Sequence, residues 1–292
     1  MTMDRRSLLK GVAAAGAGAA VTALPLEAST PKPEIPPDAF GMLYDATLCI
    51  GCRACVTACK EANAMPGNLY NPPEDLSGDT KNIIKVWHRD QPDQSYMKAQ
   101  CMHCLDPACV RACMIGSFQK REFGIVTWDP TKCIGCRYCQ VACPFAIPKF
   151  QWEKAMPKIV KCELCNHRIN DSTGKPMPAC CEVCPKEAVI AGDYRDLLAE
   201  AQRRIDEHPE RYYPAGAPKI YGAEDGGGTQ VLYLAGVDFE NLGLPDLGTE
   251  PAGISAAAIQ HTIYKGFVAP VALYGILGAV MWRNRRSGKE EE

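Results

Sequence analysis

The sequence has 292 residues, which is enough for one large domain or two smaller ones with a packed core. Its hydrophobic fraction of 47% and charged fraction of 23% exclude a wholly disordered chain. The 32 Lys and Arg nearly balance the 34 Asp and Glu, and the net charge of −2 argues against a nucleic-acid-binding protein. The unusual count is 17 Cys, all of which lie between Cys49 and Cys184.

The first residues have the layout of an export signal. Arg5-Arg6 and four further residues precede a weakly apolar stretch, rich in Ala and Gly, that ends at Leu26. This order is typical of a bacterial twin-arginine signal. We expect residues 1–28 to form that signal, with cleavage after Ala28, although Leu26 departs from the usual small residue; an uncleaved N-terminal anchor is the alternative. Residues 29–39 contain four prolines and are predicted to be a linker.

The cysteine-rich body spans residues 40–192, and its insertion at 60–100 includes a predicted strand at 83–87. An extension, 193–258, follows it. Asp193 is expected to cap a helix whose apolar residues share one face: Leu197, Leu198, Ala201 and Ile205. The glycine run at 226–228 precedes a predicted strand at 230–234. It lacks the Gly-Lys-Ser/Thr of a phosphate-binding loop, so a tight turn is expected.

The C-terminal region is predicted to anchor the protein in a membrane. Residues 266–282 carry no charge, and a helix of that length spans about 25 Å. Tyr264 and Trp282 stand where interfacial aromatics are found, and Arg283 begins a basic flank. We therefore expect a transmembrane helix within 259–283 and a cytoplasmic tail at 284–292; a buried helix of a soluble domain is the alternative.

The cysteines form four groups with related spacings. They are Cys49, Cys52, Cys55 and Cys59; Cys101, Cys104, Cys109 and Cys113; Cys133, Cys136, Cys139 and Cys143; and Cys162, Cys165, Cys180 and Cys184. The third group, followed by Pro144, matches the bacterial [4Fe–4S] spacing C-x2-C-x2-C-x3-C-P. In that pattern three thiolates bind one cubane and the fourth binds its neighbour. Gly51 and Gly135 would let the loop backbone approach the cluster.

Other cysteine chemistries fit less well. Three cysteines within seven residues are poor geometry for a tetrahedral zinc site, and clustered spacing does not favour a disulfide scaffold. No C-x-x-C is followed by His, which excludes c-type haem attachment. One cysteine of the 17 is left over. The other groups end with three residues before their last cysteine, and Cys180 keeps that interval, so Cys181 is the spare. The spacing leaves open which groups pair with each other.

The motifs Lys161-Cys162-Glu163-Leu164-Cys165 and Pro178-Ala179-Cys180 resemble those of four-cluster ferredoxin-like subunits of membrane oxidoreductases, such as formate dehydrogenase, dimethyl sulfoxide reductase and nitrate reductase. The twin-arginine start and three further segments narrow the resemblance: Gly226-Gly227-Gly228-Thr229-Gln230-Val231-Leu232, Asp238-Phe239-Glu240-Asn241-Leu242 and Ile259-Gln260-His261-Thr262-Ile263-Tyr264-Lys265-Gly266. These look like the iron–sulfur subunit of hydrogenase-2-type [NiFe] hydrogenases.

The resemblance implies an α+β fold with two ferredoxin-like dicluster units, with insertions, plus the C-terminal transmembrane helix. It also implies a ligand set for each of four [4Fe–4S] clusters. Cluster 1 takes Cys49, Cys52, Cys55 and Cys184; cluster 2 takes Cys101, Cys104, Cys109 and Cys143; cluster 3 takes Cys133, Cys136, Cys139 and Cys113; cluster 4 takes Cys162, Cys165, Cys180 and Cys59. Lys60 and Met114 depart from the proline that often follows the fourth cysteine.

The function implied is that of an electron-transfer subunit without a catalytic centre of its own, on the periplasmic face of the bacterial cytoplasmic membrane. Its expected partners are the small and large subunits of a hydrogenase, an integral membrane quinone-reactive subunit and the lipid bilayer, with no nucleic acid. One alternative is the equivalent subunit of a molybdopterin oxidoreductase, of the formate dehydrogenase or dimethyl sulfoxide reductase type. Another is an exported metal-binding structural protein without redox function.

Overall fold

The computed structural model describes residues 34–68, 74–88, 94–169, 177–254, 270 and 273–283. The chain divides into two units, residues 1–31 and residues 32–292. The first unit lies outside the described residues, and so does the predicted export signal.

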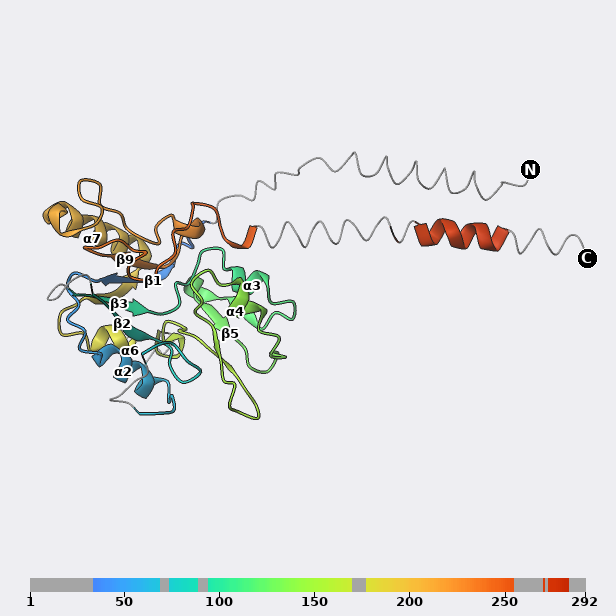
Figure 1. Cartoon of the computed structure of the whole chain (residues 1–292), viewed down its shortest axis with the longest axis horizontal. Coiled ribbons are helices and arrows are strands. Elements are labelled where there is room, and N and C mark those ends of the chain that lie inside the picture. Colours follow the sequence, from blue (N-terminus) through green and yellow to red (C-terminus); the bar gives the residue numbers. More distant parts are fainter. Residues whose placement is uncertain are drawn as a thin grey trace, which may run out of the picture. The chain divides into compact units, whose positions relative to one another are not determined.

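The described residues contain both strands and helices in alternation (Figure 1). The strands are β1 (Phe40–Asp45), β2 (Ile83–His88), β3 (Gln94–Ala99), β4 (Phe118–Lys120), β5 (Val126–Trp128), β6 (Lys149–Phe150), β7 (Ile159–Val160), β8 (Val189–Asp193) and β9 (Val231–Leu234). The helices are α2 (Ala54–Ala62), α3 (Ala108–Arg111), α4 (Tyr138–Ala142), α5 (Asn166–Ile169), α6 (Ala179–Glu182) and α7 (Tyr194–Glu207). Short 3-10 turns are η1 (Glu122–Gly124), η2 (Pro209–Arg211) and η3 (Asp225–Gly227). This mixed content agrees with the α+β class, and the strand predicted at 83–87 is confirmed as β2.

A three-stranded sheet with the order β8-β1-β9 organises the body. Strand β1 pairs antiparallel with β8 and parallel with β9, so that Met42 lies opposite both Ala191 and Val231. The remaining strands form two-stranded pairs, namely β2-β3, β4-β5 and β6-β7. Strand β9, which belongs to the predicted extension, therefore shares a sheet with the first strand of the cysteine-rich body.

Strand β1 is buried on both faces, and alternation along it assigns each side chain to one face. Met42 and Tyr44 pack in a core that contains cysteines, whereas Leu43 packs against residues of α7. Strand β9 repeats the pattern, since Tyr233 lies in the cysteine-containing core and Leu232 lies against α7. The sheet thus separates the cysteines from the outer helix (Figure 1).

Helix α7 forms where the sequence predicts it. The Asp193 side chain caps its first turn by accepting hydrogen bonds from the backbone N–H of Arg195, at 2.8 Å, and of Asp196, at 3.4 Å. Leu197, Ala201 and Ile205 are buried against the sheet, while Leu198 packs at the edge of the same cluster. The predicted amphipathic face is confirmed.

The short helices that carry cysteines pack in two pairs. Helix α2, with Cys55 and Cys59, packs against α6, with Cys180. Helix α3, with Cys109, packs against α4, with Cys139. The first cysteine group therefore lies beside the fourth, and the second lies beside the third.

Among the described residues, no helix is both long enough and apolar enough to cross a bilayer. Most of the predicted anchor, 259–283, lies outside them; its described part, residues 270 and 273–283, is helical. The transmembrane anchor stays a prediction from the sequence.

Candidate metal centres

The same turn recurs in the first and third cysteine groups. Gly51 and Arg53 have φ angles of 69° and 59°, and the corresponding Gly135 and Arg137 have φ angles of 73° and 63°. These left-handed residues curl the backbone around the side chains of the flanking cysteines. The backbone N–H of Gly51 points at the Cys49 Sγ, 3.5 Å away, and that of Leu164 points at the Cys162 Sγ, 3.4 Å away. Such N–H groups stabilise the negative charge that a metal-bound sulfur carries.

The folded chain gathers the cysteines into four neighbourhoods, which we call sets 1 to 4 after the clusters they are predicted to hold. In set 1, Cys49 lies within electrostatic range of Cys184 and Cys52, and Cys55 lies within range of Cys49 and Cys52 as well as of Cys180 from set 4. In set 2, Cys104 feels Cys101, Cys143 and Cys109. In set 3, Cys139 feels Cys133, Cys136 and Cys113. In set 4, Cys59 feels Cys162, Cys180 and Cys165. In every set one cysteine comes from the partner group.

The sets also form a series. Electrostatic contacts link Cys55 of set 1 to Cys180 of set 4, Cys162 of set 4 to Cys101 of set 2, and Cys109 of set 2 to Cys139 of set 3. The order in space is therefore 1, 4, 2, 3. All four cysteines of set 4 are buried, whereas sets 1 and 3 each present one exposed cysteine, Cys52 and Cys136 respectively.

Burial keeps most of these thiols protonated in the metal-free chain. It raises the pKa of Cys55 and of Cys162 to about 12, and that of Cys143 to about 11, because a thiolate loses its hydration there. A metal that binds such a thiol must displace its proton, and in return the bound metal supplies the positive charge that the interior lacks.

The adjacent cysteines Cys180 and Cys181 share one proton unequally. A hydrogen bond from the Cys181 thiol lowers the pKa of Cys180, and the same bond raises the pKa of Cys181. Cys180 faces set 4 as the proton acceptor, and Cys181 is the donor beside it.

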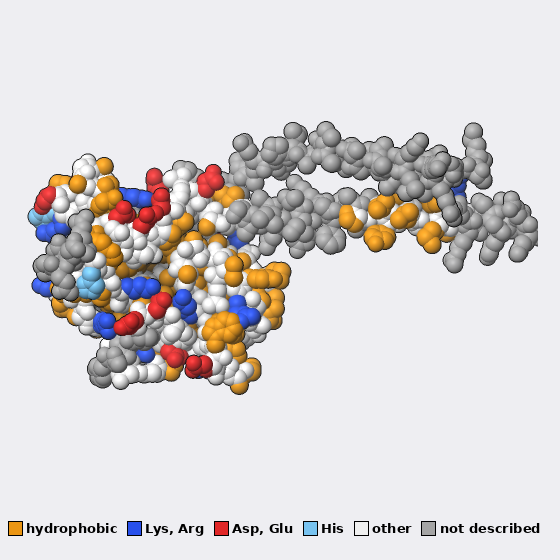
Figure 2. Space-filling model, viewed as in Figure 1, with side chains coloured by type: hydrophobic (Ala, Val, Ile, Leu, Met, Phe, Trp, Pro, Cys, Tyr) orange, Lys and Arg blue, Asp and Glu red, His pale blue; other side chains and the backbone are white. Residues whose placement is uncertain are grey.

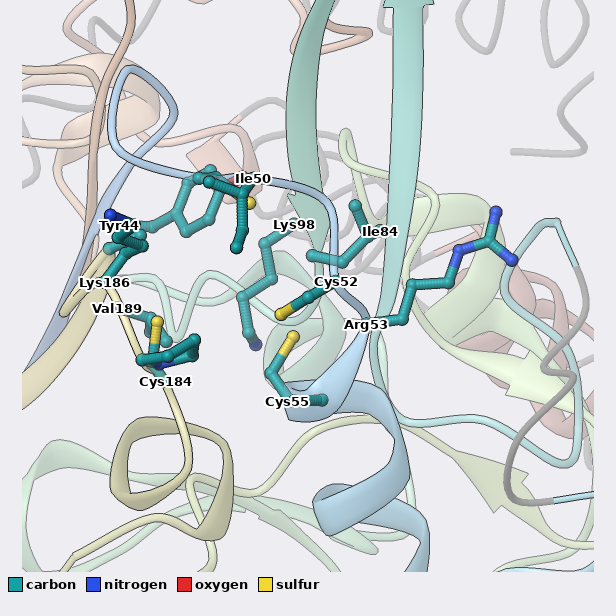
Figure 3. A pocket seen from close by; sticks show the side chains of 14 residues that line it. Tyr44, Ile50, Cys52, Arg53, Cys55, Ile84, Lys98, Cys184, Lys186 and Val189 are labelled. Carbon is teal, nitrogen blue, oxygen red and sulfur yellow. The ribbon is translucent and has the colours of Figure 1, made fainter.

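The donor groups suit an iron–sulfur cluster. Cys49, Cys52, Cys55 and Cys184 line a common pocket (Figure 3). None of the 17 cysteines, all of which are described, forms a disulfide. In the described part of the chain, no three His, Cys, Asp or Glu side chains converge closely enough to hold a single metal ion. A cubane is larger than an ion, and its thiolates surround it at a distance from one another.

Three lysines near the cysteines are buried, namely Lys60, Lys98 and Lys161, and their burial was not predicted from the sequence. Lys98 and Lys161 are 0% and 3% exposed. Lys161 is visible only as part of the motif around Cys162, and Lys98 follows a strand pattern in which lysine usually marks the solvent face. For Lys161 and Lys98, the only available signals were a lysine directly before Cys162 and another three positions before Cys101.

Comparison with known proteins agrees with this chemistry. Residues 92–194 match the family described as a 4Fe-4S dicluster domain, which makes the chain a ferredoxin-type iron–sulfur protein. It is 40% identical to the hydrogenase-2 operon protein HybA of Escherichia coli O157:H7, over 98% of this chain and 97% of the relative. It is 33% identical to the iron–sulfur subunit of the nitrate-inducible formate dehydrogenase of Escherichia coli K12, over 80% of both chains, and 30% identical to the formate dehydrogenase iron–sulfur subunit of Haemophilus influenzae, over 82% of this chain and 77% of the relative.

The chain belongs to the family of the hydrogenase-2 operon protein HybA, and it is an electron-transfer iron–sulfur subunit. The resemblance found in the sequence is thereby confirmed.

The two equivalent glycines provide a matched test of the cysteine loops. A Cβ on Gly51 would overlap the Tyr96 ring, whereas one on Gly135 would meet Phe150 at an ordinary 3.6 Å. Both alanines carry the left-handed strain of about 1–2 kcal/mol, but only Gly51→Ala adds a clash. We expect Gly51→Ala to lower the thermal midpoint of the iron-loaded protein more than Gly135→Ala, and Tyr96→Leu in the same chain to recover part of the loss. Equal falls for the two alanine variants would show that the Tyr96 contact is unimportant.

Proposed function

We propose that the protein relays electrons between a periplasmic [NiFe] hydrogenase and a quinone-reactive integral membrane subunit, with no catalytic centre of its own. Its membership of the HybA family, and that relative's place in a hydrogenase-2 operon, support the hydrogenase. The formate dehydrogenase subunits match a smaller share of the chain and support the molybdopterin alternative less well.

The proposed cofactors are four [4Fe–4S] clusters, held by sets 1 to 4 as defined above. When bound, such clusters supply one-electron donor and acceptor sites. The chain's own contribution is to supply sixteen thiolates, to orient backbone N–H groups toward sulfur, and to keep water from the inner sets.

The observation that carries the proposal is the order of the sets. They form a single series, 1-4-2-3, whose inner members are more deeply buried and whose two ends each present an exposed cysteine. A relay needs this arrangement, because a partner must reach each end while the middle is insulated from other redox agents.

The two ends differ in surface chemistry, which suggests which partner meets which end. Around set 3 several apolar side chains are exposed, with Val141 at 87% and Met114 at 73% exposure, together with Ile115, Ile134 and Tyr138, while Lys132 is exposed beside Cys133. Figure 2 shows hydrophobic side chains on the side of the body that carries α3 and α4. Beside set 1 lie Arg53 and Lys186, which Figure 3 shows extending from the rim of the pocket. We assign set 3 to the integral membrane partner and set 1 to the hydrogenase.

The proposed location is the periplasmic face of the cytoplasmic membrane. The twin-arginine motif at Arg5-Arg6 supports export, and the uncharged segment 266–282 with its basic flank supports an anchor. A structural metal protein is the remaining alternative, and a colourless, zinc-containing sample would favour it over an iron–sulfur relay.

The ligand assignment is tested by three serine substitutions. Cys181→Ser should leave the iron content and all cluster signals unchanged, because the three-residue interval before Cys184 assigns ligation to Cys180. Cys180→Ser should remove or alter one cluster, and Cys59→Ser should affect that same cluster from an earlier group. Low-temperature electron paramagnetic resonance of the reduced proteins gives the answer. If Cys181→Ser loses a cluster while Cys180→Ser does not, the assignment is shifted by one residue; if Cys59→Ser and Cys180→Ser affect different clusters, the pairing of the groups is wrong.

The assignment of set 3 to the integral membrane subunit and of set 1 to the hydrogenase is tested by an aspartate substitution at each end. Val141→Asp should leave the iron content unchanged and reduce co-purification of the integral membrane subunit from detergent-solubilised membranes at least tenfold. Ile50→Asp, at the set 1 end, should instead reduce recovery of the hydrogenase subunits. Met156→Asp, at an apolar position between β6 and β7 whose exposure of 83% is close to that of Val141, is the control. The opposite pattern of losses would reverse the orientation.

Export and anchoring are tested separately. Arg5→Lys combined with Arg6→Lys should retain the folded, iron-loaded protein in the cytoplasm, whereas Lys10→Arg should not. Truncation before residue 266 should release the exported body from membranes as a soluble, iron-loaded protein. Normal export of the double variant would show that the signal is misread, and truncated protein that withstands a carbonate wash without its partners would disprove the anchor.

A further inference from the structure

Lys98 occupies the space between sets 1 and 4. It extends from β3, opposite Ile84 of β2, and its Nζ donates to the side-chain oxygen of Gln100. The Tyr233 hydroxyl donates to its backbone oxygen at 2.6 Å and so fixes the strand. The cysteines whose charges act on it are Cys180, Cys55 and Cys162. Figure 3 shows its side chain reaching in among the cysteines of set 1.

Lys161 occupies the corresponding place between sets 4 and 2. It follows β7 and directly precedes Cys162, and its Nζ donates to the backbone oxygens of Val126 and, at 2.8 Å, of Cys162. The cysteines that act on it include Cys101, Cys109 and Cys162.

The other charged and titratable groups around Lys161 do not cancel its charge. Glu163 is the nearby anion, and it is paired with Lys81 at 3.2 Å. The buried His103 accepts the N–H of Val126 at 3.0 Å, and burial together with the two nearby lysines Lys161 and Lys120 lowers its pKa, so it is neutral. Lys161 is therefore held in place as a cation by backbone oxygens.

Burial of a cluster makes its reduction less favourable, and the two lysines lie where a positive charge opposes this effect. Four thiolates give a cubane a net negative charge, and an added electron increases it. Water stabilises that charge at the exposed sets but not at the buried ones, so burial alone would lower the electron affinity of the inner clusters. A fixed cation at short range in a low-dielectric interior has the opposite effect.

We propose that Lys98 and Lys161 are buried cations that raise the electron affinity of the inner clusters. The effect is largest for the cluster of set 4, because set 4 lies beside both lysines. The inference rests on the proposed ligand sets. It explains why a lysine stands at each of the first two junctions of the series 1-4-2-3, where neither forms a salt bridge with a carboxylate in the described residues.

The test is a potentiometric titration of the purified, iron-loaded protein, followed by low-temperature electron paramagnetic resonance. Lys98→Met removes the charge but keeps the length of the side chain. It should lower the electron affinity of cluster 4 at least tenfold, a shift of about 59 mV to more negative potential for one electron, and shift cluster 1 less. Lys161→Met should shift clusters 4 and 2. Lys98→Arg and Lys161→Arg should stay within threefold of the parent protein. Lys85→Met, on the neighbouring strand but exposed and paired with Asp75 at 2.9 Å, should shift nothing.

The outcomes separate this inference from the proposed function. A parent protein that lacks the iron or the signals of four clusters would defeat the ligand assignment. Unchanged potentials in methionine variants with full iron content would overturn the role of the lysines. If a methionine variant loses iron, Lys98→Gln and Lys161→Gln repeat the test. Loss of iron in every neutral variant, with retention in both arginine variants, would also overturn the inference, because it would assign the lysines to assembly.

Discussion

Hydrogen bonds to Gln230 join the two halves of the cysteine-rich body. Its backbone oxygen accepts from Met42 of β1, at 3.0 Å, and its backbone N–H donates to His103 in the second cysteine group, at 3.1 Å. Its side-chain amide donates to the backbone oxygens of Phe40, at 2.8 Å, and of Phe123, at 2.7 Å. One residue of the extension therefore holds β1, beside sets 1 and 4, against the loops of set 2. The spacing between sets 4 and 2 therefore depends on this strand. That spacing matters because the rate of electron transfer between two clusters falls as their separation grows.

The same region explains why the glycine run is needed. A Cβ on Gly227 would overlap Pro251, and one on Gly228 would come within 2.8 Å of Leu105, whose N–H donates to the Gly228 oxygen. The run was predicted as a tight turn from composition, and the turn is confirmed. Its role in joining the halves could not be predicted, because it depends on the parallel pairing of β9 with β1, nearly 190 residues away in the chain. Features that depend on local sequence, such as the glycine turn, the Asp193 cap and the strand at 83–87, were predicted correctly. The pairing of distant strands was not, because it is set by tertiary packing.

The cysteines show the same contrast between local features, which the sequence predicts, and long-range contacts, which it does not. Spacing within a group is local, because one turn of backbone must present three sulfurs, and so the groups could be found in the sequence. The partner of each group is decided by the packing of α2 on α6 and of α3 on α4, which spacing does not encode. Lys98 shows the limit most clearly. Lysine is rarely buried without a partner, and the cysteines that the fold brings to it, from the first and fourth groups, give its burial a physical reason.

The related first and third groups have diverged where they meet the surface. Arg53 and Arg137 occupy the same position of the same turn, yet Arg137 stacks on Trp152, 4.4 Å from the ring centroid, while Arg53 extends from the pocket rim of set 1 (Figure 3). A relay with two identical ends could be docked by either partner in either direction, and half of such encounters would be unproductive. The two ends thus differ in the side chains they present, with Arg53 and Lys186 beside set 1 and exposed Val141 and Met114 beside set 3, and a difference of this kind would disfavour docking of a partner at the wrong end through desolvation and charge.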